Sequence, residues 1–317
     1  MKIRKLIPIF LTVVCLASAP VNIMAQDLTD NPPTITITPT PTEAPVKPVT
    51  PAKELRVNGN KISFYIHGKK AKNCWQTYRG ARYYFSANGN AYKGTHRINN
   101  KIYVFDENGH LLQNQTNKMV TVFGQKYYII SKYGHPATGY FIYKNNLYYA
   151  DPKGRCYQNR SRENGQLYFT ANGSAKKNTN ALLKMKVMQT VASITNPKMT
   201  REQKLRACWN YIVDENKFNY GGGDPDRHRP NWYREAALQM LSTRTGSCYY
   251  FACAFAAMAR EIGYKNIKLW MGYDHCWVTI DGLHYDPQAH WTRWILNVYG
   301  LSAHPLGSSV DICDFMK

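Results

Sequence analysis

Long apolar segments are almost absent from this chain of 317 residues. The apolar segment Leu6–Ala19 near the start is shorter than the roughly 20 residues that cross a bilayer. Because Lys2, Arg4 and Lys5 precede it, we predict a secretory signal peptide over residues 1–25. An uncleaved membrane anchor is the alternative. After cleavage, no stable membrane span is expected.

Acidic residues are also few, at 20 Asp and Glu against 41 Lys and Arg. The imbalance is concentrated in one region, because residues 53–180 hold 21 basic and 5 acidic residues, whereas residues 181–317 hold 16 and 12. In an exported protein, such a region indicates an anionic wall polymer or a polysaccharide as partner. Nucleic acid is not expected, and a merely solvated basic surface is the plain alternative.

Motifs for metal and phosphate binding are missing as well. The glycine run before Asp224 is too short to cradle a phosphate, and no full calcium loop follows Asp224 and Asp226. Cys253, Cys276 and His284 match no standard zinc spacing. We therefore expect no cofactor and no metal.

Residues 26–53 form a linker in this interpretation. Between residues 27 and 53 the chain has seven prolines and seven threonines, a composition that cannot bury a core. The linker separates the predicted signal peptide from the folded part of the chain.

An aromatic-rich pair recurs over residues 54–180, and a glycine follows each pair. The pairs are Phe64-Tyr65, Tyr83-Tyr84, Tyr103-Val104, Tyr127-Tyr128, Tyr148-Tyr149 and Tyr168-Phe169. Turn dipeptides precede most of them, so each unit is predicted to be a short β-hairpin. One hairpin is marginal alone, so the units must stack on one another. We predict an all-β hairpin-repeat solenoid in the N-terminal half.

This pattern resembles the cell-wall-binding, choline-binding-like repeats of Gram-positive surface proteins, most closely at residues 75–85. The resemblance implies binding to a cell-wall polymer: teichoic acid, glucan or peptidoglycan. Choline sites of that family use paired tryptophans, whereas Trp75 is the only tryptophan of this region. Candidate ligand-binding aromatics are Trp75, Tyr83, Tyr84, Tyr127, Tyr128, Tyr148 and Tyr149. Their alternative role is the stacking core of the repeats.

The segment Thr245–Tyr264 is apolar on every side until Arg260. A helix that is apolar all round is buried, and Gly263 is its expected stop. Cys248 then stands at the start of a central helix, where free backbone amides and the helix dipole favour a thiolate. Seven cysteines remain after signal removal, an odd number. Cys248 is therefore the expected free thiol, while the pairing of the others stays open.

Asp281-Gly282 lies between two apolar-rich runs, which predicts a two-residue hairpin turn. With this turn, His275 and Trp277 share one face, and Asp286 becomes a diagonal neighbour of His275 at roughly 7–8 Å. The spacing therefore allows a His–Asp pair opposite a cysteine. A core histidine and a hairpin-closing aspartate are the alternatives.

Further elements complete a mixed C-terminal part. We expect helices over Met199–Phe218, with a capping box of Thr200 and Gln203, and over Trp232–Met240. Strands are expected over Lys265–Trp270, Cys276–Ile280 and Leu283–Asp286. Helices followed by antiparallel strands make this an α+β domain.

Three motifs in the order Cys, His, Asp resemble those of the transglutaminase-like superfamily: Gly246-Ser247-Cys248 before an Ala-rich helix, His275-Cys276-Trp277-Val278, and Asp286-Pro287. The resemblance implies an α+β transglutaminase-like (papain-like) domain over residues 181–317. It also implies Cys248 as nucleophile, His275 as base and Asp286 as orienting carboxylate. Gln288 departs from the pattern, since a Thr often follows the Asp-Pro pair.

These features together predict a secreted, extracellular, wall-associated cysteine enzyme that acts on protein or peptide amides through a thioester. An amine acceptor would make it a transglutaminase, and water would make it a peptidase or deamidase. The Cys248 backbone amide is expected to hold the oxyanion, with Trp232 as a candidate partner. The alternative is a non-catalytic surface adhesin or carbohydrate-binding protein with an inactive transglutaminase-like domain.

Overall fold

The computed structural model describes residues 52–272, 274–295, 297–307 and 311–316. The predicted signal peptide, and the predicted linker up to residue 51, lie outside these described residues. Within the described ranges, no helix is long and apolar enough to cross a membrane.

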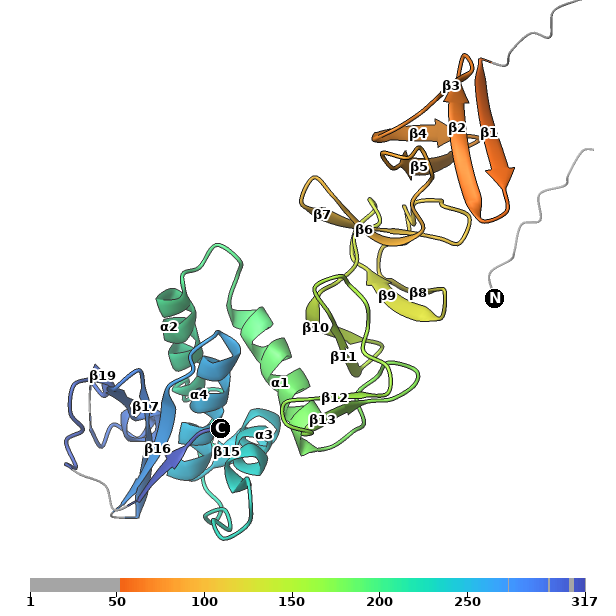
Figure 1. The fold of residues 1–317 in the computed structure, drawn as a ribbon. Helices are drawn as coiled ribbons and strands as arrows, with labels where there is room; N and C mark the ends of the chain where they lie inside the picture. Colours follow the sequence, from red (N-terminus) through yellow and green to blue (C-terminus); the bar gives the residue numbers. More distant parts are fainter. Residues whose placement is uncertain (1–51, 273, 296, 308–310, 317) are drawn as a thin grey trace, which may run out of the picture. The chain divides into compact units, whose positions relative to one another are not determined.

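The first part of the described chain consists of consecutive antiparallel hairpins (Figure 1). Their strands are β1 (Lys53–Asn58), β2 (Lys61–Ile66), β3 (Lys69–Lys70), β4 (Cys74–Tyr78), β5 (Ala81–Phe85), β6 (Gly94–Ile98), β7 (Lys101–Phe105), β8 (Lys118–Val122), β9 (Gln125–Ile129), β10 (Gly139–Tyr143), β11 (Asn146–Ala150), β12 (Arg160–Arg162) and β13 (Leu167–Phe169). Each aromatic-rich pair lies on the second strand of its hairpin, as the hairpin prediction requires. That the hairpins make a solenoid stays a prediction.

Backbone hydrogen bonds join successive hairpins at a nearly constant position. The amides of residues 91, 111, 156 and 175 donate to carbonyls of the preceding hairpin, at 2.7–2.9 Å. Pro136 occupies the equivalent position of one repeat and has no N–H to donate. The adjacent His135 supplies the missing bond, because its Nδ1 lies 2.7 Å from the Ile102 carbonyl oxygen. A side chain thus replaces a backbone donor at this joint.

Five helices and a mixed set of strands follow in the described chain. They are α1 (Thr179–Ile194), α2 (Arg201–Ile212), β14 (Asn219–Tyr220), α3 (Trp232–Thr243), β15 (Thr245–Gly246), α4 (Cys248–Glu261), β16 (Ile267–Gly272), β17 (His275–Ile280), β18 (Leu283–Tyr285), α5 (Pro287–Trp291), β19 (Tyr299–Leu301) and β20 (Asp311–Asp314). The main sheet has the order β19-β18-β17-β16-β20 and is antiparallel throughout. Helices beside an antiparallel sheet make this part α+β.

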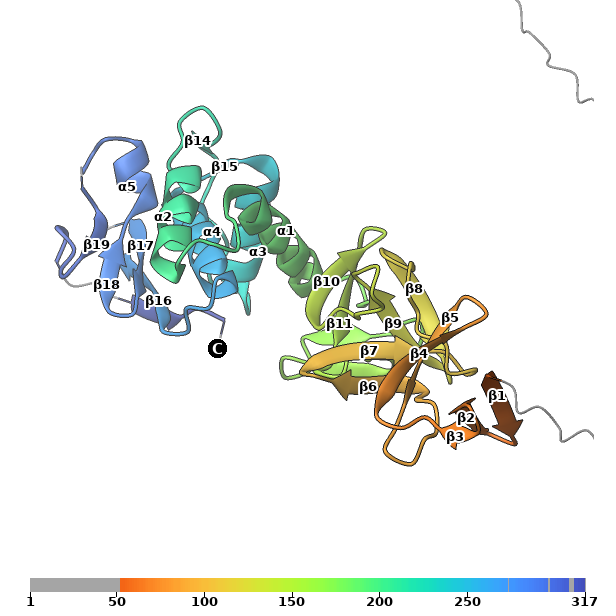
Figure 2. The ribbon, with the colours of Figure 1, turned by 90° about the horizontal axis from the view of Figure 1, so that it is seen from above.

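Helix α4 is the centre of the C-terminal core. Every residue from Cys248 to Ala259 is buried, as predicted from its apolar sequence. It packs against α2, α3 and β17, and Figures 1 and 2 show it beside these elements. This depth places Cys248, the first residue of the helix, inside the domain and not on its surface.

Two expectations about the helices need correction. Helix α1 was not expected, although Asn178 caps it by accepting a hydrogen bond from the Ala181 amide. The expected helix Met199–Phe218 is shorter, because α2 ends at Ile212. Its predicted capping box, Thr200 with Gln203, is present.

Candidate active site

Cys248 stands at the N-terminus of α4, behind the extended residue Ser247. Its side chain is directed at the start of β17. The Sγ atom lies 3.9 Å from the Asp274 carbonyl oxygen, and the Cys276 backbone amide donates a hydrogen bond to it. Both sequence neighbours of His275 therefore contact the sulfur of Cys248.

The hairpin β17–β18 forms with the predicted register. Ile280 pairs with Leu283, and Asp281 and Gly282 have φ values of 50° and 87°. Positive φ at both central residues is the type I′ geometry that this dipeptide favours. His275 opens β17 and is 4% exposed. It stacks beside Trp277 at 6.1 Å between ring centroids, on the shared face that the alternation predicted.

Asp286 is fully buried and holds both of its oxygens in hydrogen bonds. Its Oδ1 caps the short helix α5 by accepting from the Ala289 amide at 3.0 Å. Its Oδ2 lies 2.5 Å from His275 Nε2. The predicted His275–Asp286 pair is thus in direct contact, and Nδ1 is left as the ring nitrogen of His275 that is not bound to Asp286.

A second histidine, His304, also binds the Asp286 carboxylate. Its Nε2 lies 3.0 Å from the same Oδ2, and its ring stacks on Trp277 at 4.1 Å with an interplanar angle of 11°. The Leu306 amide lies 3.3 Å from His304 Nδ1. An amide can only donate, so Nδ1 carries no proton and Nε2–H donates to Asp286.

His304 was not identified from the sequence. It lies in the irregular segment after β19, followed by Pro305, and no motif marks it. Only the folding of this segment over the sheet brings it beside Asp286. Trp277 completes the cluster, because its Nε1 donates to His284 Nδ1 at 3.0 Å.

The pKa of Asp286 is lowered in this environment. Burial alone would raise its pKa, but hydrogen bonds from His275 and His304 outweigh the effect of burial. The carboxylate is therefore ionised, and it is suited to hold an imidazole in one orientation and to stabilise an imidazolium.

The pKa of Cys248 shifts against the sequence-based expectation. Burial raises the pKa of this thiol to about 12, although backbone amides of Cys276 and Tyr249 act in the opposite direction. The expected thiolate at the helix start is therefore wrong for this closed site. The helix position was right, but the cost of placing a charge in a buried site exceeds the favourable effect of the helix dipole. Deprotonation requires a base beside the sulfur.

The remaining cysteines are free thiols in the described part of the chain. Cys253 and Cys276 are completely buried, and burial holds the pKa of each well above its usual value. They pack in the core of the C-terminal part. Trp232 is buried with its ring 5.9 Å from that of Tyr249, and its role toward an oxyanion stays a prediction.

The candidate aromatics of the repeats fall into two groups. Tyr83, Tyr127 and Tyr148 are buried, which supports the stacking-core alternative for these three. The partly exposed candidates are Trp75, Tyr84, Tyr128 and Tyr149.

Arginines of the chain cover two of the partly exposed rings. The Arg82 guanidinium lies 4.3 Å from the Trp75 ring centroid, and the Arg162 guanidinium lies 3.6 Å from that of Tyr149. These two aromatic faces are therefore already in contact with cations of the chain itself.

Comparison with known families identifies the C-terminal part. The model of the transglutaminase-like superfamily matches residues 188–293, a range that includes Cys248, His275 and Asp286. This part of the chain is a transglutaminase-like domain, as its motifs predicted. No curated protein matches the sequence.

Several solved structures resemble the chain over part of its length. Choline binding protein F from Streptococcus pneumoniae is 22% identical, over 39% of this chain and 40% of that protein, with a TM-score of 0.28. The modular Cpl-1 endolysin complexed with a peptidoglycan analogue is 25% identical, over 40% and 38%, with a TM-score of 0.31. Alternansucrase in complex with isomaltononaose is 21% identical, over 40% and 10%, with a TM-score of 0.25. This chain spans less than half of the length of each.

We predict that His304→Ala weakens the acid dependence of stability. The lowered pKa of Asp286 stabilises the fold above the unfolded value of about 3.9, and this stabilisation is lost as the pH falls through the folded value. Removing one donor raises the pKa of Asp286, so the free energy of unfolding should drop by about 1.5–3 kcal/mol at pH 7 and change less between pH 7 and pH 3. Urea titrations at several pH values measure this.

His304→Gln retains a donor and should lie between the wild type and His304→Ala. His228→Ala removes an exposed histidine of the same domain and should leave the acid dependence unchanged. Equal pH profiles for the wild type and His304→Ala would show that His304 does not stabilise the carboxylate.

Proposed function

We propose that the transglutaminase-like domain is a cysteine enzyme that acts on amide bonds, and that the repeats attach it to the cell wall. The observation that supports this proposal most strongly is the direct hydrogen bond between His275 and Asp286. The two sequence neighbours of His275 contact the sulfur of Cys248 at the N-terminus of α4. The resemblance to the transglutaminase-like superfamily implies either an acyltransferase or a hydrolase. The group that accepts the acyl chain, an amine or water, decides which reaction follows.

In the first half of the reaction, Cys248 Sγ attacks the carbonyl carbon of a substrate amide. His275 Nδ1 takes the thiol proton, since Nε2 is bound to Asp286. The carbon–nitrogen bond then breaks, the same proton leaves with the amine or ammonia, and a thioester forms. Asp286 keeps the imidazole oriented and stabilises its transient positive charge.

In the second half, an amine or water attacks the thioester and restores the thiol. An amine produces a new amide, as in a transglutaminase, whereas water produces a carboxylate, as in a peptidase or deamidase. The oxyanion in both halves would be held by backbone amides of the first turn of α4, including that of Cys248. The Ser247 hydroxyl, which is buried and has no hydrogen-bond partner among the described residues, lies next to this turn.

A non-catalytic adhesin is the second candidate. Its specific support is the environment of Cys248, which is 3% exposed and whose pKa is raised to about 12 by burial. In that function the repeats would do the binding, and the His–Asp pair would be a core interaction.

We predict that activity depends on Cys248 and not on its neighbour in the same helix. The protein would be incubated with a glutamine peptide and a fluorescent primary amine, while ammonia release and peptide cleavage are followed in parallel. Cys248→Ala should lower the rate at least about a thousandfold, because the nucleophile is lost. Cys253→Ala, at a fully buried packing position of the same helix, is the matched control and should stay within a few fold of the wild type.

The assays separate the two candidates. Equal product formation by the wild type and Cys248→Ala would contradict the proposed enzyme activity. The absence of Cys248-dependent product in amine incorporation, ammonia release and peptide cleavage would contradict it as well. Retention on purified cell walls without such product would favour the adhesin.

We also predict that the protein binds purified Gram-positive cell walls through charge. The region of residues 53–180 carries 21 basic against 5 acidic residues, so retention should weaken as salt rises and on walls stripped of teichoic acid. Free choline should not release the protein, because Arg82 and Arg162 already cover the faces of Trp75 and Tyr149. Co-sedimentation measures retention, and release by choline would contradict this account of the repeats.

A further inference from the structure

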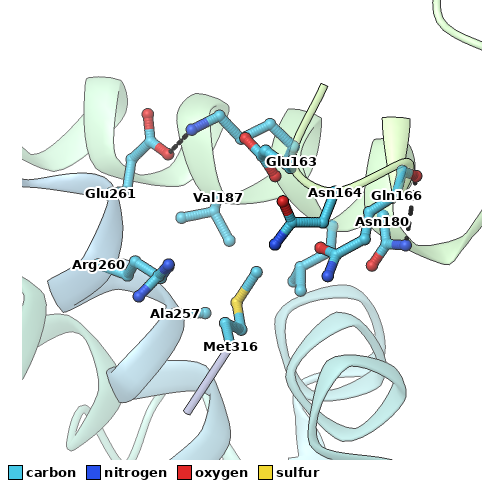
Figure 3. Close-up of a pocket in the computed structure, with 11 residues that line it drawn as sticks. Glu163, Asn164, Gln166, Asn180, Val187, Ala257, Arg260, Glu261 and Met316 are labelled. Atoms are coloured by element: carbon cyan, nitrogen blue, oxygen red, sulfur yellow. Dashed lines mark hydrogen bonds and ion pairs between the residues drawn. The ribbon is translucent and has the colours of Figure 1, made fainter. Parts of the chain in front are cut away.

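A cavity of about 230 Å³ lies at the opposite end of α4 from Cys248. The turn of hairpin β12–β13, helix α1, the last turn of α4 and Met316 line it (Figure 3). Helix α4 has 14 residues, so the cavity is about 20 Å from Cys248. The residues that line the cavity do not include Cys248, His275 or Asp286.

One wall of the cavity consists of amide side chains that a buried arginine orients. Arg234 is 3% exposed, and its Nη1 donates to Gln166 Oε1 and to Asn180 Oδ1, each at 2.5 Å. A guanidinium has only donors, so both amide oxygens must face it and both NH₂ groups must face elsewhere. The NH₂ group of Asn180 bonds the Gln166 carbonyl oxygen at 3.4 Å. The NH₂ group of Gln166 remains as a donor at the cavity wall.

The opposite wall carries one cation that has no partner among the residues that the structure describes. Lys184 is paired with Glu261 at 2.7 Å, and its ammonium also lies 4.6 Å from the Tyr140 ring centroid. The Arg260 guanidinium, by contrast, makes no hydrogen bond or ion pair with another described residue. Figure 3 shows Arg260 and Asn164 on opposite sides of the cavity, with the Met316 thioether between them.

The remaining lining limits the ligand in size and polarity. Leu183, Val187, Ala257 and Met316 provide an apolar surface. The acid Glu163 is exposed at the rim, where it accepts a hydrogen bond from the Tyr140 hydroxyl at 2.5 Å. The volume is slightly below the roughly 300–1,000 Å³ of pockets for drug-sized ligands. The ligand should therefore be small, rich in acceptors and partly apolar.

We propose that this cavity is a second binding site, which takes the carboxyl-terminal end of a short peptide with a small aliphatic last residue. Arg260 would bind the carboxylate, as guanidinium groups do in a bidentate arrangement. The amide donors of Asn164 and Gln166 would bind the peptide carbonyls, and the apolar surface would take the aliphatic side chain. This proposal is based on the cavity alone, so it does not depend on whether Cys248 is catalytic.

The test is calorimetric titration of the full-length protein with acetyl-Ala-Ala and with acetyl-Ala-Ala-amide. The free acid should bind with a Kd of about 1 mM or tighter, as expected for a ligand of this size. The amide, which lacks the carboxylate, should bind at least about tenfold more weakly. Arg260→Gln should weaken binding of the acid to the same degree and make the two peptides equal.

Two further variants complete the test. Arg97→Gln removes an exposed arginine of β6 and should leave the Kd unchanged. Ala257→Leu adds volume inside the cavity and should abolish binding. An unchanged melting temperature should show that this variant remains folded. Equal binding of the acid and amide peptides to the wild type, unchanged binding to Arg260→Gln, or binding of N-acetylglucosamine but of neither peptide would each overturn the proposal.

Discussion

The hydrogen bonds to the buried carboxylate of Asp286 are the interactions on which the C-terminal domain depends most. The charge of this carboxylate is completely removed from water, so every favourable contact must come from the protein. His275 on β17, the Ala289 amide of α5 and His304 after β19 supply those contacts. One side chain thus connects a central strand, a short helix and an irregular segment. The loss of any one donor should affect the geometry at the other two.

The surroundings of Cys248 follow from the same enclosure. The buried environment that strengthens the His275–Asp286 bond also disfavours a free thiolate, and it raises the pKa of Cys248 to about 12. In the proposed mechanism, proton transfer to His275 would avoid an isolated thiolate, because the imidazolium would remain beside Asp286. In this account the base, and not the helix dipole, makes the cysteine nucleophilic.

Local sequence signals predicted the framework of the site, whereas tertiary contacts had to be observed. Asp281-Gly282 determined the hairpin register, and that register placed His275 on the face of Trp277 and next to Asp286. Nothing local indicated His304, because the segment that carries it has no periodicity and acquires its contact only through folding over the sheet. The position of Cys248 at the start of a buried helix was readable, but the balance between burial and the helix dipole that determines its pKa was not. In the repeats, the aromatic pairs predicted the hairpins, but only the structure showed that arginines cover Trp75 and Tyr149.

The rate of iodoacetamide alkylation at Cys248 against pH, mapped by mass spectrometry, tests this account most directly. The account predicts alkylation of the wild type at neutral pH, because His275 can take the thiol proton. In His275→Ala the reaction should move to much higher pH, toward the value of about 12 that burial imposes on the pKa of this thiol. Identical profiles for the two proteins would contradict the account and leave Cys248 as a packing residue.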